Sequence, residues 1–118
     1  MVMPLRQQKG IEKNMKKYEE LVKDMDAAVK GGDLEKVKEL LNVDSKLLYE
    51  TNFFGSWLHK AAKAGQAEVA RYLIDAGIDI NQKDELMETG AISHAIKGGN
   101  IEIIRMIIER NPVLDTSE

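Results

Sequence analysis

The chain contains no cysteine, only two histidines and two prolines, and just 5% aromatic residues among its 118 positions. Without cysteine it has no disulfide framework, no thiolate metal site and no cysteine nucleophile, and two histidines leave little for an imidazole metal centre. Because aromatic residues are so few, the core must be built from aliphatic side chains and methionine. The composition therefore predicts a protein poorly equipped for catalysis or cofactor chemistry.

Long apolar runs and a strong charge imbalance are also missing. No stretch approaches the roughly 18 apolar residues that cross a bilayer, and the opening segment lacks the apolar centre of a secretory signal. Seventeen basic and 20 acidic residues leave a net charge of −3, too mild for a typical nucleic-acid-binding protein. We therefore expect a cytoplasmic protein that binds neither membranes nor nucleic acids.

The chain does contain an internal repeat. Gly32 and Gly65 are 33 residues apart, and Gly65 and Gly99 are 34 apart. Aligning these glycines brings further positions into register, namely Lys30 with Lys63 and Lys97, Glu35 with Glu68 and Glu102, Ala28 with Ala61 and Ala95, and Leu40 with Leu73 and Ile107. Such a period predicts stacked units, each with two short helices around its glycine. Gly65 and Gly77 are placed to end the helices of the middle unit in a left-handed conformation.

The middle unit carries the motifs that resemble a known family. Ser-Trp-Leu-His at 56–59 is similar to the Thr-Pro-Leu-His of ankyrin repeats, and Gly-Ile-Asp-Ile-Asn at 77–81 is similar to their Gly-Ala-Asp-Val-Asn. The third unit departs at its opening, residues 89–95, and the first keeps only its helical part. The resemblance implies an all-α ankyrin-repeat solenoid of helix-turn-helix units with projecting β-hairpin-like turns.

The boundaries follow from the same alignment. We expect a flexible N-terminal arm over residues 1–10, and an ankyrin-repeat domain over 11–118. The domain divides into a leading helix at 11–24 and repeats at approximately 25–51, 52–84 and 85–118. The leading helix is predicted because the chain lacks Gly and Pro from 11 to 30 and carries an apolar stripe, which consists of Ile11, Met15, Tyr18, Leu21, Val22, Met25 and Val29. This stripe is expected to dock on the first repeat, with a partner or dimer contact as the alternative.

The two ends of the array differ in polarity. Lys36 and Glu39 in the first unit occupy the positions of Val69 and Tyr72, as suits an outer face on which nothing stacks. At the corresponding positions the third unit has the apolar residues Ile103 and Met106, and Ile107 follows. We therefore expect an incompletely covered C-terminal face, which either self-associates through Ile103, Met106 and Ile107 or continues into a longer array.

No catalytic, cofactor-binding or metal-binding residue is predicted. Ser56 with His59, and Ser93 with His94, lack an evident orienting carboxylate and oxyanion site. The resemblance implies that His59 is structural and ties neighbouring turns by hydrogen bonds. The acidic residues around the following loop lack the ligand order of a calcium site and predict a solvated loop; they are Asp79, Asp84, Glu85 and Glu88.

The resemblance implies a non-enzymatic module that binds a partner protein through its turn tips and concave helix face, as an adaptor or as an inhibitor or neutralising protein. Apolar tips are unusual in turns and typical of interface anchors. The partner-binding residues predicted on this basis are Asn52, Phe53, Phe54, Lys63, Leu86, Met87 and Lys97. The aligned lysines favour an acidic partner. The alternative is a structural module that self-assembles through its C-terminal repeat face or its N-terminal helix.

Overall fold

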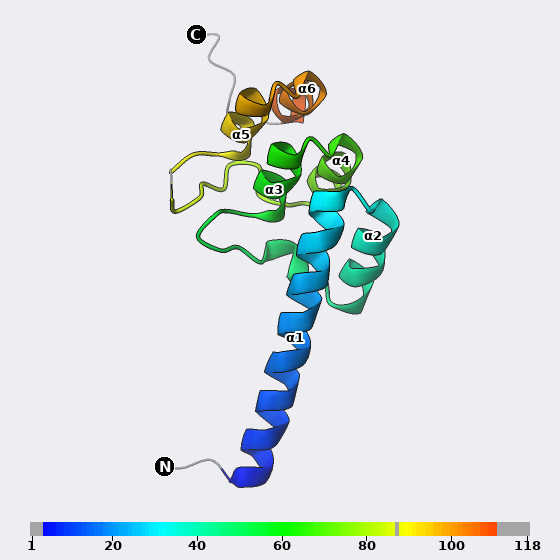
Figure 1. Ribbon diagram of the computed structural model, residues 1–118, viewed down its shortest axis with the longest axis vertical. Coiled ribbons are helices and arrows are strands. Elements are labelled where there is room, and N and C mark those ends of the chain that lie inside the picture. The colour runs from blue at the N-terminus through cyan, green and yellow to red at the C-terminus, as the bar shows by residue number, and fades with distance from the viewer. Residues whose placement is uncertain (1–3, 87, 111–118) are drawn as a thin grey trace.

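The computed structural model describes residues 4–86 and 88–110, which form α-helices and a single 3-10 helix, η1, but no strand. In chain order the elements are α1 (Leu5–Gly31), α2 (Leu34–Val43), η1 (Ser45–Tyr49), α3 (Trp57–Ala64), α4 (Ala67–Asp75), α5 (Ala91–Gly98) and α6 (Ile101–Arg110). The C-terminal end of α1 packs beside α3 and α5 in one layer, and α2, α4 and α6 form the other (Figure 1). The predicted all-α solenoid of paired helices is confirmed.

The glycines that align the repeat end the first helix of each pair. Gly32, Gly65 and Gly99 follow α1, α3 and α5 with φ angles of 74°, 74° and 70°. L-residues with a Cβ are strained in this left-handed conformation, whereas glycine adopts it freely. Gly77, also predicted to be left-handed, follows α4 with a φ of 102°.

Hydrogen bonds between units explain the polar side chains that follow Gly65 and Gly99. Gln66 Nε2 donates to the carbonyl oxygen of Lys30, and Asn100 Nδ2 donates to that of Ala62, both at 2.9 Å. Each bond is accepted by a carbonyl in the last turn of the first helix in the preceding unit, where carbonyls lack the i+4 partner of the helix interior. The carbonyl of Ala62 also accepts from the N–H of Gly65, at 3.3 Å. The units approach so closely that a Cβ on Gly32 would lie 2.4 Å from Gln66 Oε1.

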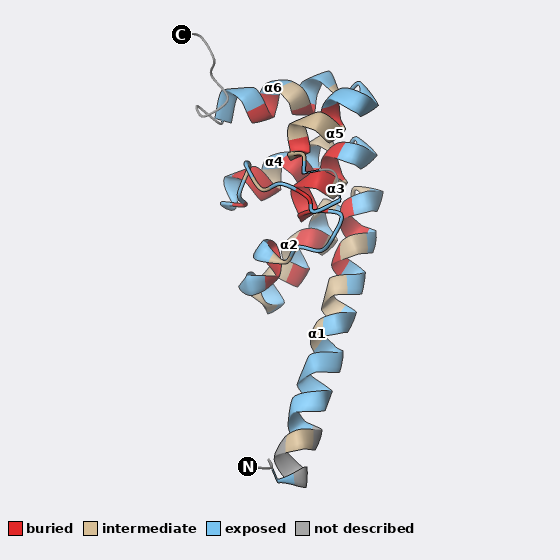
Figure 2. Cartoon of the chain, turned by 90° about the vertical axis from the view of Figure 1, so that its left-hand side faces the viewer, coloured by how far each residue is buried: buried red, intermediate tan, exposed pale blue. Residues whose placement is uncertain are grey.

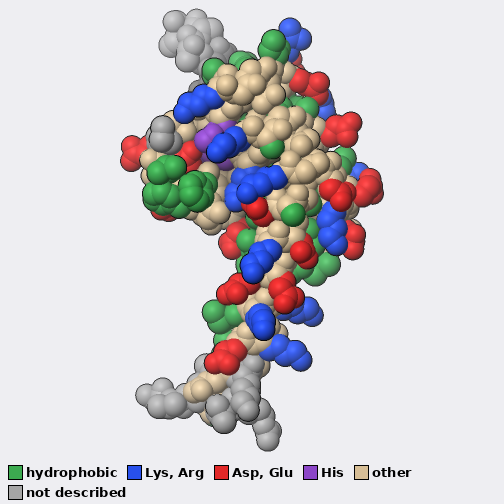
Figure 3. Space-filling view, viewed as in Figure 1, with side chains coloured by type: hydrophobic (Ala, Val, Ile, Leu, Met, Phe, Trp, Pro, Cys, Tyr) green, Lys and Arg blue, Asp and Glu red, His purple; other side chains and the backbone are tan. Residues whose placement is uncertain are grey.

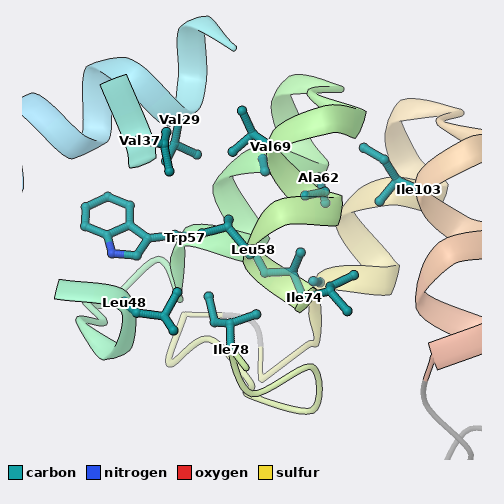
Figure 4. Close-up of a cluster of buried hydrophobic side chains, with 14 of the residues drawn as sticks. Val29, Val37, Leu48, Trp57, Leu58, Ala62, Val69, Ile74, Ile78 and Ile103 are labelled. Atoms are coloured by element: carbon teal, nitrogen blue, oxygen red, sulfur yellow. The ribbon is translucent and has the colours of Figure 1, made fainter. Parts of the chain in front are cut away.

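One continuous core lies between the two layers and runs from Met25 to Ile107 (Figure 4). It is aliphatic apart from Trp57, which is buried and donates from Nε1 to the carbonyl oxygen of Leu47 at 2.7 Å. The indole nitrogen therefore keeps a hydrogen-bond partner inside the core, as a buried tryptophan requires. The expectation that packing comes from Leu, Ile, Val, Ala and Met is confirmed.

α1 differs from the prediction at both ends. It begins at Leu5, so residues 5–10 of the expected arm lie in the helix, and it runs without a break through the expected boundary at 24 and 25. Its N-terminal half projects from the body of the molecule and is largely exposed (Figures 1 and 2). Ile11 and Met15 are 43% and 59% exposed, so this part of the stripe does not dock on the first repeat.

The predicted self-association surface is a second correction. Ile103, Met106 and Ile107 are buried within the chain, because they pack between α6 and the preceding unit. Figure 4 shows Ile103 beside Ala62 of α3. In each unit these positions face the preceding unit. The first unit has no preceding unit, which is why Lys36 and Glu39 can be polar there. Their apolar character marks a unit that has a predecessor and does not indicate whether a further unit stacks after it.

No helix in the described part of the chain combines the length and the apolar character that crossing a membrane would need.

Candidate partner-binding groove

The turn before α3 is a tight hairpin tip. The backbones of Asn52 and Gly55 exchange two hydrogen bonds, of 3.1 and 2.9 Å, and the Asn52 side chain accepts a third from the Phe54 N–H at 2.8 Å. The short loop leaves no room for an aromatic ring inside it. Phe53 and Phe54 therefore project outwards, 50% and 60% exposed, with their rings edge to face at 5.8 Å.

The turn before α5 is joined to this tip. The N–H groups of Glu85 and Leu86 both donate to the carbonyl oxygen of Phe53, each at 3.2 Å. Leu86 is 51% exposed and lines the same groove as Phe54. Figure 3 shows exposed hydrophobic side chains gathered at one side of the molecule. Met87, the other residue predicted at this tip, lies outside the described residues.

Beside the tips, a groove of about 780 Å³ runs along the concave face of the helices. Its lining comes from the end of α1, from α3 and α5, and from both turns; it consists of Lys30, Phe54, His59, Lys60, Lys63, Ala64, Asp84, Leu86, His94 and Lys97. We call it the lysine-rimmed groove. Figure 3 shows basic side chains and histidine next to a cluster of hydrophobic side chains.

The lysines of the groove fall into two pairs. Lys30 and Lys60 each contact a different carboxylate oxygen of Asp26 at 2.9 Å. Burial by itself raises the pKa of Asp26, but the hydrogen bonds and charges of these lysines outweigh it and lower the pKa. Lys63 and Lys97 are exposed, and neither forms an ion pair with any carboxylate of residues 4–86 or 88–110. Their positive charge remains available to a ligand.

His59 forms the floor of the groove and ties three segments together. Its Nδ1 accepts hydrogen bonds from the backbone N–H and the hydroxyl of Ser56, at 3.1 and 2.9 Å, so Nε2 carries the ring proton and donates to the carbonyl oxygen of Thr89 at 3.0 Å. The tying role implied by the family resemblance is therefore present. Burial lowers the pKa of His59, and the charge of His94 adds to this, against the opposing effects of Thr89 and Asp84.

Asp84 corrects the prediction of a solvated acidic loop. It is only 3% exposed, whereas Asp79, Glu85 and Glu88 are exposed as expected. Its Oδ2 accepts from the Thr89 hydroxyl at 3.1 Å and contacts His94 Nε2 at 2.8 Å. These partners replace the water that a buried carboxylate loses.

His59, Asp84 and His94 place potential metal ligands within 4.8 Å of one another. Hydrogen bonds already occupy both ring nitrogens of His59, so a metal ion would have to displace the Thr89 bond, in a groove surrounded by lysines. Nor do these residues form a catalytic relay, since the buried carboxylate orients His94 while the Ser56 hydroxyl bonds to the other histidine. The geometry favours a structural network that holds the two turns against α3 and α5.

The structure brings Phe54, Lys63, Leu86 and Lys97 to one groove from separate elements. Asn52 forms the hairpin tip, and Phe53 lies beside Phe54 outside the lining. Sequence reasoning missed Asp84 and His94 as partners. His94 occupies the position of Lys60 in the repeat, which points to the groove, and this register was the available signal.

Comparison with known proteins agrees with this architecture. A family model of ankyrin repeats in three copies matches residues 25–117. The chain is similar to two proteins of Oryza sativa subsp. japonica, the probable E3 ubiquitin-protein ligases XBOS32 and XBOS33, with 30% identity over 84 residues in each case. The match covers 70% of this chain but only 17% and 16% of those proteins, so the similarity concerns a small part of their length.

Proposed function

The chain belongs to the ankyrin-repeat family, and from this premise we propose that it is a non-enzymatic module that binds a partner protein in the lysine-rimmed groove. The observation that carries the proposal is the meeting, in one groove, of two exposed lysines, Lys63 and Lys97, with two exposed apolar side chains, Phe54 and Leu86. The family's repeats are generally protein-interaction modules. The ligase activity in the relatives' names is not carried over, because the match covers about a sixth of their length.

The chemistry of the groove favours an acidic partner with an apolar anchor. Exposed lysines steer a negatively charged partner and favour its bound orientation. Large apolar side chains supply binding energy once water is excluded from them, at about 25 cal/mol per Å² of buried apolar surface. The N–H of Phe54 donates to the Asn52 side chain, and the N–H of Leu86 donates to the carbonyl oxygen of Phe53, so the backbone at both apolar residues is already ordered and less conformational entropy is lost when a partner binds them.

Affinity purification from the source organism, with quantitative mass spectrometry, tests the proposal. A charge-reversal variant, Lys63→Glu with Lys97→Glu, should retain about a tenth or less of the captured partner, and so should an apolar variant, Phe54→Ser with Leu86→Ser. Capture by the original chain should fall as salt is added, because exposed charges are screened.

The matched control is Lys23→Glu with Lys46→Glu, which makes the same change in charge at exposed lysines outside the groove. All variants should keep the original helical circular dichroism. If the control loses the partner as strongly as the groove variants do, only overall charge matters and the groove is not the site.

Both an adaptor and an inhibitor or neutralising protein are compatible with this groove. An inhibitor's partner loses its own activity when the groove is occupied, and an adaptor's partner keeps it. Assay of the captured partner with and without the chain distinguishes the two roles. A cytoplasmic location belongs to the same proposal.

A further inference from the structure

The outer face of the third unit carries large apolar side chains at positions that are buried in the middle unit. With the 34-residue offset, Leu58, Ala62, Ala70 and Ile74 correspond to Ile92, Ile96, Ile104 and Ile108. The four residues of the middle unit are buried, because the third unit stacks on them. In the third unit, Ile96 and Ile108 are 59% and 51% exposed, and the other two are half-buried. We call these four residues the isoleucine face.

The face is continuous and has a definite orientation. Ile92 and Ile96 are one turn apart on α5, and Ile104 and Ile108 are one turn apart on α6, so the two helices present parallel apolar stripes. They lie at the end of the stack opposite the first unit, which is the upper end of the molecule in Figure 1. Ile101, 64% exposed, stands at the rim.

The size of these side chains argues against a further unit stacked in the usual way. Between the second and third units, the small Ala62 and Ala70 let the next pair of helices approach closely, and Ala91 and Ala95 of α5 are buried there. In the third unit, Ile96 and Ile104 occupy the positions that correspond to these two alanines. Their larger side chains fill the space that a closely packed next unit would need. The face therefore suits a partner that meets isoleucine with side chains of similar size.

In the described part of the chain, the opposite end of the array is more polar. The outer side of α2 carries Glu35, Lys36 and Glu39 beside the exposed Val43, so stacking the isoleucine face on it would bury charged groups for few apolar contacts. Head-to-tail assembly of copies is thereby disfavoured. The isoleucine face of a second copy, by contrast, matches it in size and polarity. The rim carries exposed charges of both signs, Arg105 and Glu109, which allows pairing across a two-fold axis.

We propose that two copies of this chain associate tail to tail through the isoleucine face. The dimer has two-fold symmetry, so each face contacts the same face of the other copy. The groove lies on the concave side and remains open in both copies, so this association is independent of the function proposed above.

The first test is the mass of the full chain in solution. Over concentrations from about 1 to about 100 µM, light scattering should show the mass rising from the 13.3 kDa monomer to twice that value. The variant Ile96→Lys with Ile108→Lys should stay at the monomer mass throughout. Both residues are exposed in the single chain, so its thermal midpoint measured at a concentration where both proteins are monomeric should match the original.

The matched control is Ile11→Lys with Met15→Lys, which places the same charges on two exposed apolar side chains of α1, away from the isoleucine face. This variant should dimerise as the original does. A monomer at every concentration overturns the proposal, and so does a dimer lost in the α1 variant but kept in the isoleucine-face variant.

A second test determines which ends of the two copies meet. Because the chain has no cysteine, a single cysteine can be introduced cleanly, and a short bis-maleimide should link Ile104→Cys chains to each other. Lys36→Cys chains, labelled at the opposite end, should stay unlinked. Links found only in a mixture of the two variants would show head-to-tail stacking and would overturn the tail-to-tail arrangement.

Discussion

Burial and hydrogen bonding hold His59 in one neutral form. Both ring nitrogens have partners, in Ser56 and Thr89, and only the form with its proton on Nε2 satisfies them all. A second proton would have to enter at Nδ1 and break the bond from the Ser56 backbone. The lowered pKa of His59 is the electrostatic counterpart of this geometry.

The stability of the fold should therefore depend on pH through His59. Its pKa lies below 6.5 in the folded chain and near 6.5 when unfolded, so below about pH 6.5 the unfolded chain binds more protons and the free energy of unfolding falls. Above that pH the contribution is complete. Asp26, whose pKa is lowered from 3.8, acts in the same direction but only in much more acidic solution. Urea titrations from about pH 8 to about pH 5 should show this loss.

The variant His59→Gln should be less stable at neutral pH and should have a flatter dependence below about pH 6.5. An unchanged slope in the variant would mean that another group is responsible.

Gly55 is a second residue whose conformation supports the groove. Its φ is 108°, and a Cβ there would lie 2.5 Å from Cγ of the His59 ring. Gly55→Ala should lower the free energy of unfolding by about 1–3 kcal/mol, because the backbone is strained and the ring must move. Gly10→Ala is the control; nothing lies within 4 Å of that Cβ and the site is helical, so this variant should be slightly more stable. Equal effects in the two variants would contradict the steric argument.

Between elements, the ties from Gln66 and Asn100 connect each second helix to the preceding unit. Both side chains bond to a carbonyl at the end of a helix of that unit, at 2.9 Å. The two ties differ in their surroundings, because that of Asn100 is partly buried and that of Gln66 is exposed. A carbonyl exposed by losing its partner is hydrated, whereas a buried one is not.

Asn100→Ala should therefore cost about 1 kcal/mol of unfolding free energy, and Gln66→Ala should cost less. Urea unfolding of both variants and of the double variant measures these values. Since the ties join different pairs of units, the two losses should add. A larger loss for Gln66 would contradict the proposed role of burial.

The whole molecule is organised around a single core that crosses all three units. Trp57, the one tryptophan of the sequence, is buried in the middle unit, and the helices are spread along the array. Neighbouring units share the core residues, so no unit can lose its structure without exposing apolar surface of the next.

Unfolding in urea should accordingly be a single transition. The midpoint followed by Trp57 fluorescence should coincide with that followed by helical circular dichroism. Should the dichroism change at clearly lower urea than the fluorescence, an end unit unfolds by itself and the core is not shared as described.

Local features of the fold were predictable because they depend on residues close in sequence. The spacing of Gly32, Gly65 and Gly99 fixes the repeat, and each glycine ends a helix by its own backbone conformation. The exposed phenylalanine tip also follows from its position in the unit. The predicted groove residues Phe54 and Leu86 could be found because apolar residues in a short turn have no core to enter.

The predictions that failed concern which part of the molecule a side chain faces, not whether the side chain is apolar or charged. Ile103 and Met106 are apolar as expected, but helical periodicity alone does not tell which neighbouring unit they face. Ile11 and Met15 continue the apolar stripe of α1 into its projecting N-terminal half, where the first repeat no longer lies beside the helix. Asp84 has the same kind of side chain as the exposed acidic residues of the loop. Only its contacts with Thr89 and His94, which the folded chain creates, distinguish it from them.

The sequence by itself determined the repeat, the helices and their ends, and the aliphatic character of the core, because these depend on spacing and on the backbone preference of single residues. Only the tertiary structure decided which faces are covered. Burial at one position depends on side chains 30 or more residues away, as the bond from His59 to Thr89 illustrates. For that reason the groove, the buried Asp84 and the exposed isoleucine face could be identified only from the arrangement of the stacked units.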